Sequence, residues 1–539
     1  MLFVVLGSLM LLTDSAGFLS TDVGGKVATL EAMKVSGGLT PDLGYWAETA
    51  DPDGSLYPMW STSHIEGKWV NATSLPMIYV AYPLYRAGGA TLAGLVPVLG
   101  TVAAALAAAA LARRLGGNGR FAFWVVGLAS PATIYALDLW EHSWGLALML
   151  AGVTAALGAS DGRDGWRDAA LAGLMFGIAA TLRQEALVYG SVAGLVLGVR
   201  LLVNGRVLAA IGRGLAMAAA AAAMLGANAV LEIAAMGGTL RGGRATGTAG
   251  AAGGALRTRI EEAVITAASP FARVDAATIA LSLALVGLLV ALGLRADRPP
   301  HERRVLAAGL LLVAAVMAVD LVAGGLGFIP GLAATTPVAV LGTTRCWRSG
   351  DNRFVAAIAL GSLPLVWAVQ YTGGAGPQWG GRYIITTGAL LIVLAAVTFT
   401  TESAAAVLRK VAIGAAVVTC VGVVWTIHRT HELADAFREL AARDEPALVF
   451  HDPFLAREGG TTVVSERYLA ATGPEDRAEA VAALEQMGID GAGFVDLDDG
   501  AAIRRLPGWE LVGTDRVELI DGIDLRVTTW QAPGAGSGP

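Results

Sequence analysis

Apolar stretches long enough to cross a membrane recur about thirteen times along this sequence, judged by the roughly 20 residues that a membrane-spanning helix needs. In lipid every backbone polar group must be bonded within its own segment, so such stretches form helices. Only 15% of the residues are charged, and the mean hydropathy is +0.60, which excludes a soluble globule. The sequence therefore predicts an all-α polytopic membrane protein of about thirteen transmembrane helices.

Basic residues gather in alternate loops between these apolar stretches. The clusters are Arg113–Arg114 with Arg120, Arg163 with Arg167, Arg206 with Arg213, Arg295 to Arg304, Arg345 to Arg353, and Arg409–Lys410. Loops rich in Lys and Arg stay in the cytoplasm, so this alternation sets the orientation of the chain. It places the N-terminus in the cytoplasm and everything after about Thr426 outside.

The N-terminal apolar run, Leu2 to Leu12, has no basic segment before it and no cleavage site after it, so we interpret it as a retained first span. It is short for a span, and a true start further upstream remains an alternative. The two cysteines, Cys346 and Cys420, indicate neither a disulfide framework nor a metal site. The composition is rich in small residues, with 70 glycines, and is typical of a bacterial protein.

The loops that face outward by elimination hold nearly all the unusual polar groups. The first of them, residues 20–76, carries several aromatic residues, which are either anchors at the membrane interface or parts of a site. From His428 the composition changes to alternating charged helical and β-like stretches. We therefore predict a transmembrane domain over residues 1–427, followed by a small extracytoplasmic α/β domain over residues 428–539.

Asp22 lies just after the first apolar run, before Gly24–Gly25 and an amphipathic stretch, and is a candidate catalytic acid or base. The alternative is structural, because Asp22 stands where a helix beginning near Val23 needs an N-cap acceptor.

Two short turns between apolar stretches also carry ionisable groups. One turn holds Glu141 and His142 between two tryptophans, and the other holds Arg183 and Glu185. Ionisable groups at a membrane are functional candidates because desolvation makes them costly. The alternatives are a solvated turn between interfacial tryptophans for the first, and a structural ion pair that closes the helix bundle for the second.

A glycine-rich segment, Gly373 to Tyr383, precedes a late apolar stretch. Its glycines allow the backbone to approach a ligand closely. Arg382 can neutralise a phosphate through its planar fork of donors, while Trp379 and Tyr383 offer flat faces to a sugar or an isoprenoid.

Taken together, these motifs resemble the GT-C superfamily of membrane glycosyltransferases, in particular the bacterial branch related to protein mannosyltransferases and lipid A aminoarabinose transferases. The features that carry the resemblance are the Asp after the first span, the Glu-His turn, the Arg-Gln-Glu turn, the Trp-Gly-Gly-Arg-Tyr segment and the outer C-terminal domain. In many members the first-loop acid belongs to a carboxylate pair. Here Asp22 is followed by Val23, so a metal-bridging pair is in doubt.

The resemblance implies transfer of a sugar from a polyprenyl-phosphate donor to an extracytoplasmic acceptor, with inversion at the anomeric carbon. Asp22 would act as general base. Arg382, Arg183 and Tyr383 would bind the donor phosphate, and Glu141, His142, Glu185 and Trp379 would bind the substrates. No cofactor, metal ligand set or nucleic-acid partner is expected, and a divalent cation, though compatible with the family, has no clear motif here.

A transporter or flippase of lipid-linked sugars is the alternative function. Such a protein should carry ionisable residues near the middle of its spans and broken helices in matching halves. Only Glu232 and Asp320 lie within apolar runs, whereas the other polar groups gather in outward loops. A second alternative, a sensor or assembly protein, leaves the cluster of Arg382, Arg183 and Glu141 unexplained.

Overall fold

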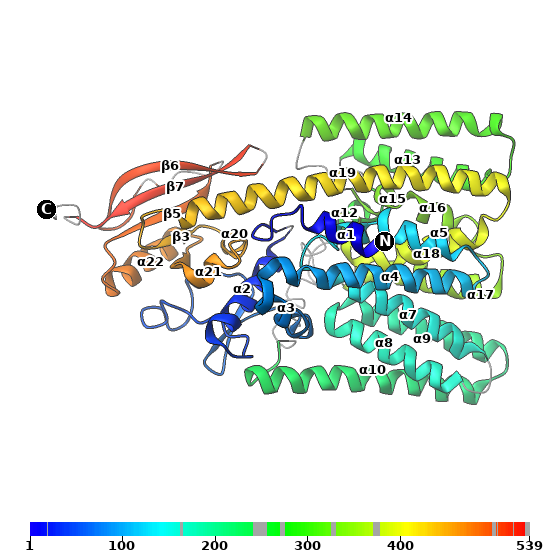
Figure 1. The fold of residues 1–539 in the computed structure, drawn as a ribbon, viewed down its shortest axis with the longest axis horizontal. Coiled ribbons are helices and arrows are strands. Elements are labelled where there is room, and N and C mark those ends of the chain that lie inside the picture. Colours follow the sequence, from blue (N-terminus) through cyan, green and yellow to red (C-terminus); the bar gives the residue numbers. More distant parts are fainter. Residues whose placement is uncertain are drawn as a thin grey trace. The chain divides into compact units, whose positions relative to one another are not determined.

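The computed structural model describes most of the chain and divides it into two compact units (Figure 1). The described residues are 1–18, 20–161, 165–240, 256–269, 275–324, 330–369, 378–498, 503, 505–520 and 522–533. Unit 1 comprises Met1–Ser8, Val96–Ala229 and Arg241–Val424. Unit 2 comprises Leu9–Leu95, Val230–Leu240 and Trp425–Pro539.

Unit 1 is built from helices, as predicted. They are α1 (Leu2–Met10), α4 (Leu95–Arg114), α5 (Gly119–Leu128), α6 (Pro131–Ile134), α7 (His142–Ser160), α8 (Gly165–Leu182), α9 (Glu185–Val203), α10 (Val207–Met236), α12 (Leu256–Ala267), α13 (Ala276–Leu294), α14 (Pro300–Gly324), α15 (Leu332–Thr335), α16 (Pro337–Thr343), α17 (Gly350–Val369), the 3-10 helix η2 (Arg382–Ile384), α18 (Ile385–Thr398) and the 40-residue α19 (Glu402–Ala441). The residues that close α1, α10 and α19, and the first residue of α4, belong to unit 2.

Within the described residues, 7 helices are long and apolar enough to cross a membrane. The chain is thus a multi-pass membrane protein, and the predicted helical class is confirmed. The count of about thirteen spans stays a prediction. Helix α19 joins the last predicted span and the charged segment that follows it in a single helix, where the sequence suggested two elements.

Small residues let the helices of unit 1 pack closely. A Cβ atom at Gly173 on α8 would collide with the main-chain carbonyl of Met217 on α10, so only glycine allows this approach. Membrane helices commonly associate through such small residues, because no water is present to drive them together.

The loops predicted to share one side of the membrane do meet at one end of unit 1. Arg114, at the end of α4, pairs with Asp161 after α7 at 3.1 Å. Arg200, near the end of α9, pairs with Asp351 at the start of α17 at 2.7 Å. These two contacts join four of the predicted basic loops in two pairs, and which side of the membrane this end faces stays a prediction.

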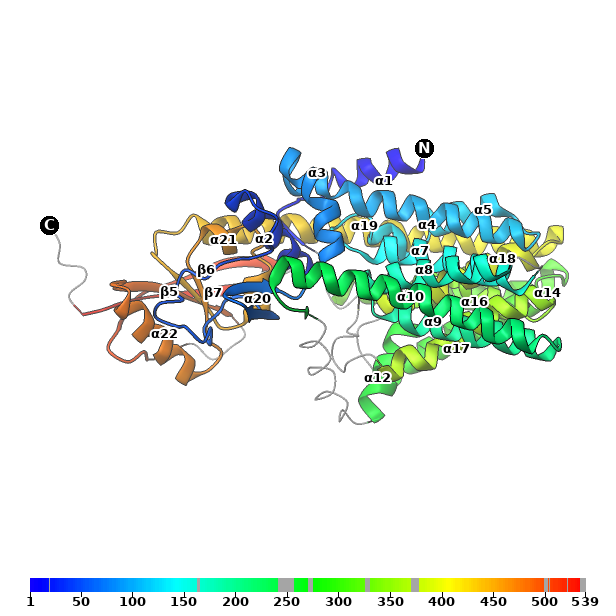
Figure 2. The same cartoon turned by 90° about the horizontal axis from the view of Figure 1, so that it is seen from below.

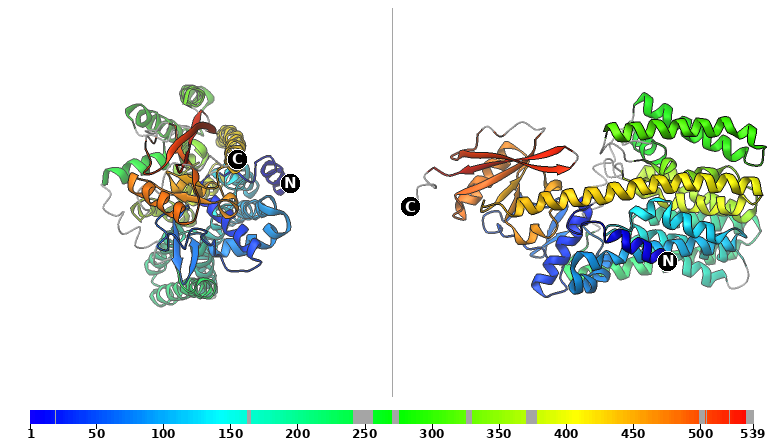
Figure 3. Two further views of the ribbon diagram at one scale, coloured as in Figure 1. Left: turned by 90° about the vertical axis from the view of Figure 1, so that its left-hand side faces the viewer. Right: turned by 45° about the horizontal axis from the view of Figure 1, so that its top comes forward.

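Unit 2 contains a five-stranded mixed sheet, part of which is visible in Figures 2 and 3. Its strand order is β4-β3-β5-β7-β6. Its strands are β3 (Leu448–Phe450), β4 (Tyr468–Ala470), β5 (Gly491–Leu497), β6 (Glu510–Ile520) and β7 (Ile523–Gln531), and its short helices are α20 (Pro453–Arg457), α21 (Thr462–Ser465) and α22 (Pro474–Gln486). Strand β3 runs parallel to β4 and β5, whereas β7 is antiparallel to β5 and β6. The α/β character predicted for this part of the chain is confirmed.

The first predicted outer loop is folded and belongs to the same unit. It forms α2 (Thr21–Ser36), a hairpin of β1 (Thr62–Ile65) with β2 (Lys68–Asn71), and the start of α3 (Leu75–Ala93). Tyr45, Leu56 and Trp69 pack in one apolar core with Val449 and Phe494 of the sheet. Trp69 therefore stabilises unit 2 from within and is not an interfacial anchor.

Trp69 also stands at the centre of a stack of rings. Its ring lies 4.7 Å from that of Tyr57 and 4.5 Å from that of His64, and both pairs are stacked. Burial of Tyr57 raises the pKa of its hydroxyl above the ordinary value, because the charged form loses its hydration.

We expect Trp69→Ala to destabilise unit 2 by about 3–5 kcal/mol, the usual effect of removing a buried tryptophan. Thermal unfolding and limited proteolysis of the purified protein in detergent measure this loss. Trp60→Ala is the matched control, because Trp60 is 38% exposed and should change stability little. Equal melting temperatures for the two variants would contradict the packing described here.

Candidate active site

A buried ionic cluster lies in unit 1, at the start of α7 and in the turn between α8 and α9. Arg183 Nη1 lies 3.0 Å from Glu141 Oε1, and Arg183 Nε lies 3.0 Å from Glu185 Oε1. The turn is tight because α8 ends at Leu182 and α9 begins at Glu185. None of the three side chains is more than 9% exposed.

Removal of one partner from such a cluster leaves an uncompensated buried charge. We expect Arg183→Gln to destabilise the protein by about 3–5 kcal/mol, the usual effect of breaking a buried ion pair. Thermal unfolding in detergent measures it. Adding Glu185→Gln to Arg183→Gln should recover part of the lost stability. It removes one of the two buried carboxylates that lose their cationic partner in the single variant. A double variant no more stable than the single one would show that the pair is not the source of the effect.

Arg382 and Tyr383 lie in η2, directly before α18, and share a cation–π arrangement with Arg183. The Arg382 guanidinium donates a hydrogen bond to the Tyr383 hydroxyl at 2.7 Å. The Tyr383 ring centroid lies 4.7 Å from the Arg382 guanidinium and 5.0 Å from that of Arg183. Tyr383 thus holds two guanidinium groups against one aromatic ring, an attraction that desolvation strengthens.

The chain reaches Arg382 through two glycines whose conformation other residues rarely adopt. Gly380 and Gly381 have φ angles of 73° and 66°, and a Cβ at Gly380 would collide with the ring of Pro131. This close approach, and not contact with a ligand, explains part of the glycine content of the predicted motif. The Gly373–Pro377 part of that motif lies outside the described residues.

Aromatic rings surround His142 beside the ionic cluster. Tyr135 stacks on His142 with ring centroids 4.8 Å apart, and Trp140 lies 4.5 Å from His142. Trp140 also lies 5.8 Å from the Arg382 guanidinium. The Tyr135 hydroxyl donates to the main-chain oxygen of Trp379 at 2.9 Å, which ties the turn before α7 to the segment before α18.

These contacts bring together every residue that the sequence predicted to bind the donor or the acceptor in unit 1. They are Glu141, His142, Arg183, Glu185, Trp379, Arg382 and Tyr383, and each is buried. Tyr135 was missed, since no charge or motif distinguishes it, although it adjoins the predicted turn. Two guanidiniums beside two carboxylates and several ring faces suit an oxyanion joined to a sugar or a lipid.

Asp22 belongs to unit 2 and lies in the first turn of α2. Ser20 stands at the N-cap, so the alternative in which Asp22 caps this helix is wrong. Asp22 Oδ1 lies 3.1 Å from Arg457 Nη1, and the Asp22 side chain is 36% exposed while that of Arg457 is 1% exposed. The carboxylate thus contacts a buried guanidinium and is itself partly exposed to solvent.

The side chain of Arg457 is itself fixed. Its Nη2 donates to Asn71 Oδ1 at 2.8 Å, and the Asn71 amide donates to the Trp60 carbonyl at 3.1 Å and to the Thr62 hydroxyl at 3.0 Å. Neither Arg457 nor Asn71 was singled out from the sequence. Arg457 is 435 residues from Asp22, and only the tertiary fold brings them together.

Among the described residues no group of three or more His, Cys, Asp or Glu side chains lies close enough to hold a metal ion.

No protein-family model and no curated protein matches this sequence. Several solved structures are similar. ArnT from Cupriavidus metallidurans, bound to undecaprenyl phosphate, shares 13% identity at a TM-score of 0.49, with 100% of this chain and 98% of that one covered. A second similar structure is the archaeal oligosaccharyltransferase AglB from Archaeoglobus fulgidus, in complex with an inhibitory peptide and a dolichol-phosphate. It shares 9% identity at a TM-score of 0.46, with 92% of this chain and 69% of that one covered. At such identities and TM-scores, the likeness says nothing of this chain's substrate.

Proposed function

We propose that this protein is a membrane glycosyltransferase that moves a sugar from a polyprenyl-phosphate donor to an extracytoplasmic acceptor of the cell envelope. The observation that carries the proposal is the buried cluster in unit 1, in which Arg183 and Arg382 flank the Tyr383 ring. Apolar helices surround a pair of cations there, which is the environment that a lipid-linked phosphate requires.

The two arginines would contribute differently. Arg183 already contacts Glu141 and Glu185, so two carboxylates offset its charge. We assign to it mainly the positioning of Tyr383 and of the turn before α9. We assign to Arg382 the contact with the donor phosphate, and Tyr383 orients its guanidinium. Glu141, His142, Glu185 and Trp379 would contact sugar hydroxyls or line the pocket that holds them.

In the reaction, an acceptor hydroxyl attacks the anomeric carbon from the face opposite the phosphate. The bond from this carbon to the phosphate oxygen breaks, and the bonding electrons leave with the polyprenyl phosphate. Asp22 accepts the hydroxyl proton as the new glycosidic bond forms, which is general-base catalysis. Arg382 stabilises the charge that develops on the leaving phosphate.

Arg457 would position the base. Its Nη1 donates to Asp22 Oδ1 at 3.1 Å, and this contact would fix the orientation of the carboxylate toward the acceptor.

The test is an assay in membranes that contain the overproduced protein, with a panel of radiolabelled polyprenyl-phosphate sugars. We expect one donor to pass its label to a membrane or cell-wall product, with release of polyprenyl phosphate. A flippase would instead move the intact donor across the bilayer without consuming it. Donor movement without any transfer would overturn the proposal.

A further inference from the structure

A groove runs along the outside of unit 1 where α4, α7 and α8 meet. It encloses about 290 Å³. Its walls are mostly small and apolar, among them Ala107 and Ala110 of α4, Ala151 of α7 and Leu171 of α8. Ala110 and Leu171 are exposed, so the groove is open to its surroundings. Helices α4 and α7 are candidate membrane spans, so we expect the open side of the groove to face lipid.

One end of the groove is charged. Arg114 and Asp168 both line this end. Both side chains approach the position that a Cβ atom at residue 158 would occupy. A Cβ atom at Gly158 would lie 2.7 Å from Asp168 Oδ2 and 3.4 Å from Arg114 Nη2. Within the described part of the chain, no ion pair joins these two side chains, whereas Arg114 pairs with Asp161 at 3.1 Å.

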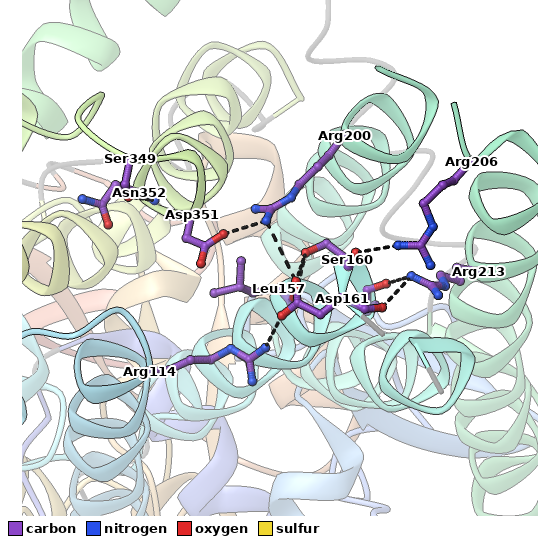
Figure 4. Close-up of polar contacts among 11 residues, drawn as sticks. Arg114, Leu157, Ser160, Asp161, Arg200, Arg206, Arg213, Ser349, Asp351 and Asn352 are labelled. Carbon is purple, nitrogen blue, oxygen red and sulfur yellow. Dashed lines mark hydrogen bonds and ion pairs between the residues drawn. The ribbon is translucent and has the colours of Figure 1, made fainter. Parts of the chain in front are cut away.

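The charged end coincides with the basic end of unit 1. Figure 4 shows Arg114, Arg200, Arg206 and Arg213 directed at the segment that closes α7. Arg206 donates to the Ser160 carbonyl at 3.2 Å, and Arg213 donates to the Asp161 carbonyl at 3.1 Å. Lys and Arg clusters of this kind lie at headgroup level on the cytoplasmic side.

The length of the groove agrees with a position that begins at headgroup level. Ala107 and Arg114 are separated by about 10 Å of helix at 1.5 Å per residue. One leaflet contributes roughly 15 Å to the hydrocarbon core. The groove therefore runs from headgroup level inward within a single leaflet, and it does not span the bilayer.

We propose that this groove binds a phospholipid whose headgroup carries both a phosphate and a primary ammonium, as phosphatidylethanolamine does. The acyl chain lies along the alanines, the phosphate contacts Arg114, and the ammonium donates to Asp168. A purely anionic lipid brings its phosphate to Arg114 but has no cation for Asp168. A choline headgroup has a cation that cannot donate a hydrogen bond. The site is independent of sugar transfer and distinct from the buried cluster around Arg183.

Native mass spectrometry of the delipidated full-length protein tests the proposal. The probes are phosphatidylethanolamine, phosphatidylglycerol and phosphatidylcholine with identical acyl chains. We expect the ethanolamine lipid to bind at least about fivefold more tightly than either of the others, a factor that corresponds to about 1 kcal/mol for one headgroup contact. Arg114→Gln and Asp168→Asn should each remove this preference.

Ala110→Phe tests the apolar part separately. It fills the groove without changing any charge and should weaken binding of all three lipids at this site. Arg120→Gln is the control, because Arg120 is exposed and does not line the groove. Thermal unfolding confirms that each variant is folded. Equal binding of the three lipids, a preference for phosphatidylglycerol, or unchanged binding to Ala110→Phe would each overturn the proposal.

Discussion

Replacing Asp22 with asparagine is expected to lower the rate of sugar transfer by about 10²- to 10⁴-fold, the contribution typical of a positioned general base. Asparagine keeps the size of the side chain and can still accept a hydrogen bond from Arg457, so α2 and its contact with α20 should persist. It has no charge with which to take the acceptor proton. The loss should therefore fall on kcat, with little change in the affinity for the donor.

The matched control is Asp53→Asn. Asp53 lies in the same outer loop and is exposed, so its replacement should leave transfer unchanged. Arg457→Gln should also slow transfer by freeing the Asp22 carboxylate, and Arg457→Lys should restore part of the rate because it keeps the charge. Full activity of Asp22→Asn, with normal folding, would remove Asp22 as the base and leave the rest of the proposal to be tested through Arg382.

The sequence predicted the helical class, the α/β nature of the C-terminal segment and the grouping of the buried cluster. Each of these has a local cause. Apolar length identifies helices in lipid, and the basic loops give the side of the membrane that each loop faces. Once the loops alternate, the turns that contain Glu141, Arg183 and Arg382 are predicted at the same end, and the structure shows that they are in contact.

Contacts that depend on tertiary packing could not be predicted. Strand β4 has only three residues and no distinct pattern, and it forms because β3 lies beside it. The aromatic residues of the first outer loop resembled interfacial anchors, yet Trp69 belongs to the core of the sheet. Nothing in the sequence distinguished Arg457 from other basic residues, and only the tertiary fold brings its guanidinium into contact with Asp22.

Replacing Arg382 with glutamine is expected to lower the rate of transfer by about 10²- to 10³-fold, comparable to the loss of one preorganised group that stabilises transition-state charge. The negative charge on the phosphate grows as the bond to the sugar breaks, and a guanidinium held against Tyr383 needs no rearrangement to meet it. Glutamine retains one amide donor but no charge.

Arg382→Lys separates charge from geometry. Lysine keeps the charge but loses the planar fork that fits two phosphate oxygens, so its rate should lie between those of Arg382→Gln and the wild type. Binding of undecaprenyl phosphate alone, measured by native mass spectrometry, should weaken in the same order. Arg409→Gln, at an exposed arginine of α19, is the control for a lost positive charge. If Arg382→Gln binds the lipid phosphate as tightly as the wild type and transfers sugar as fast, the anion site lies elsewhere, and the buried cluster only closes the helix bundle.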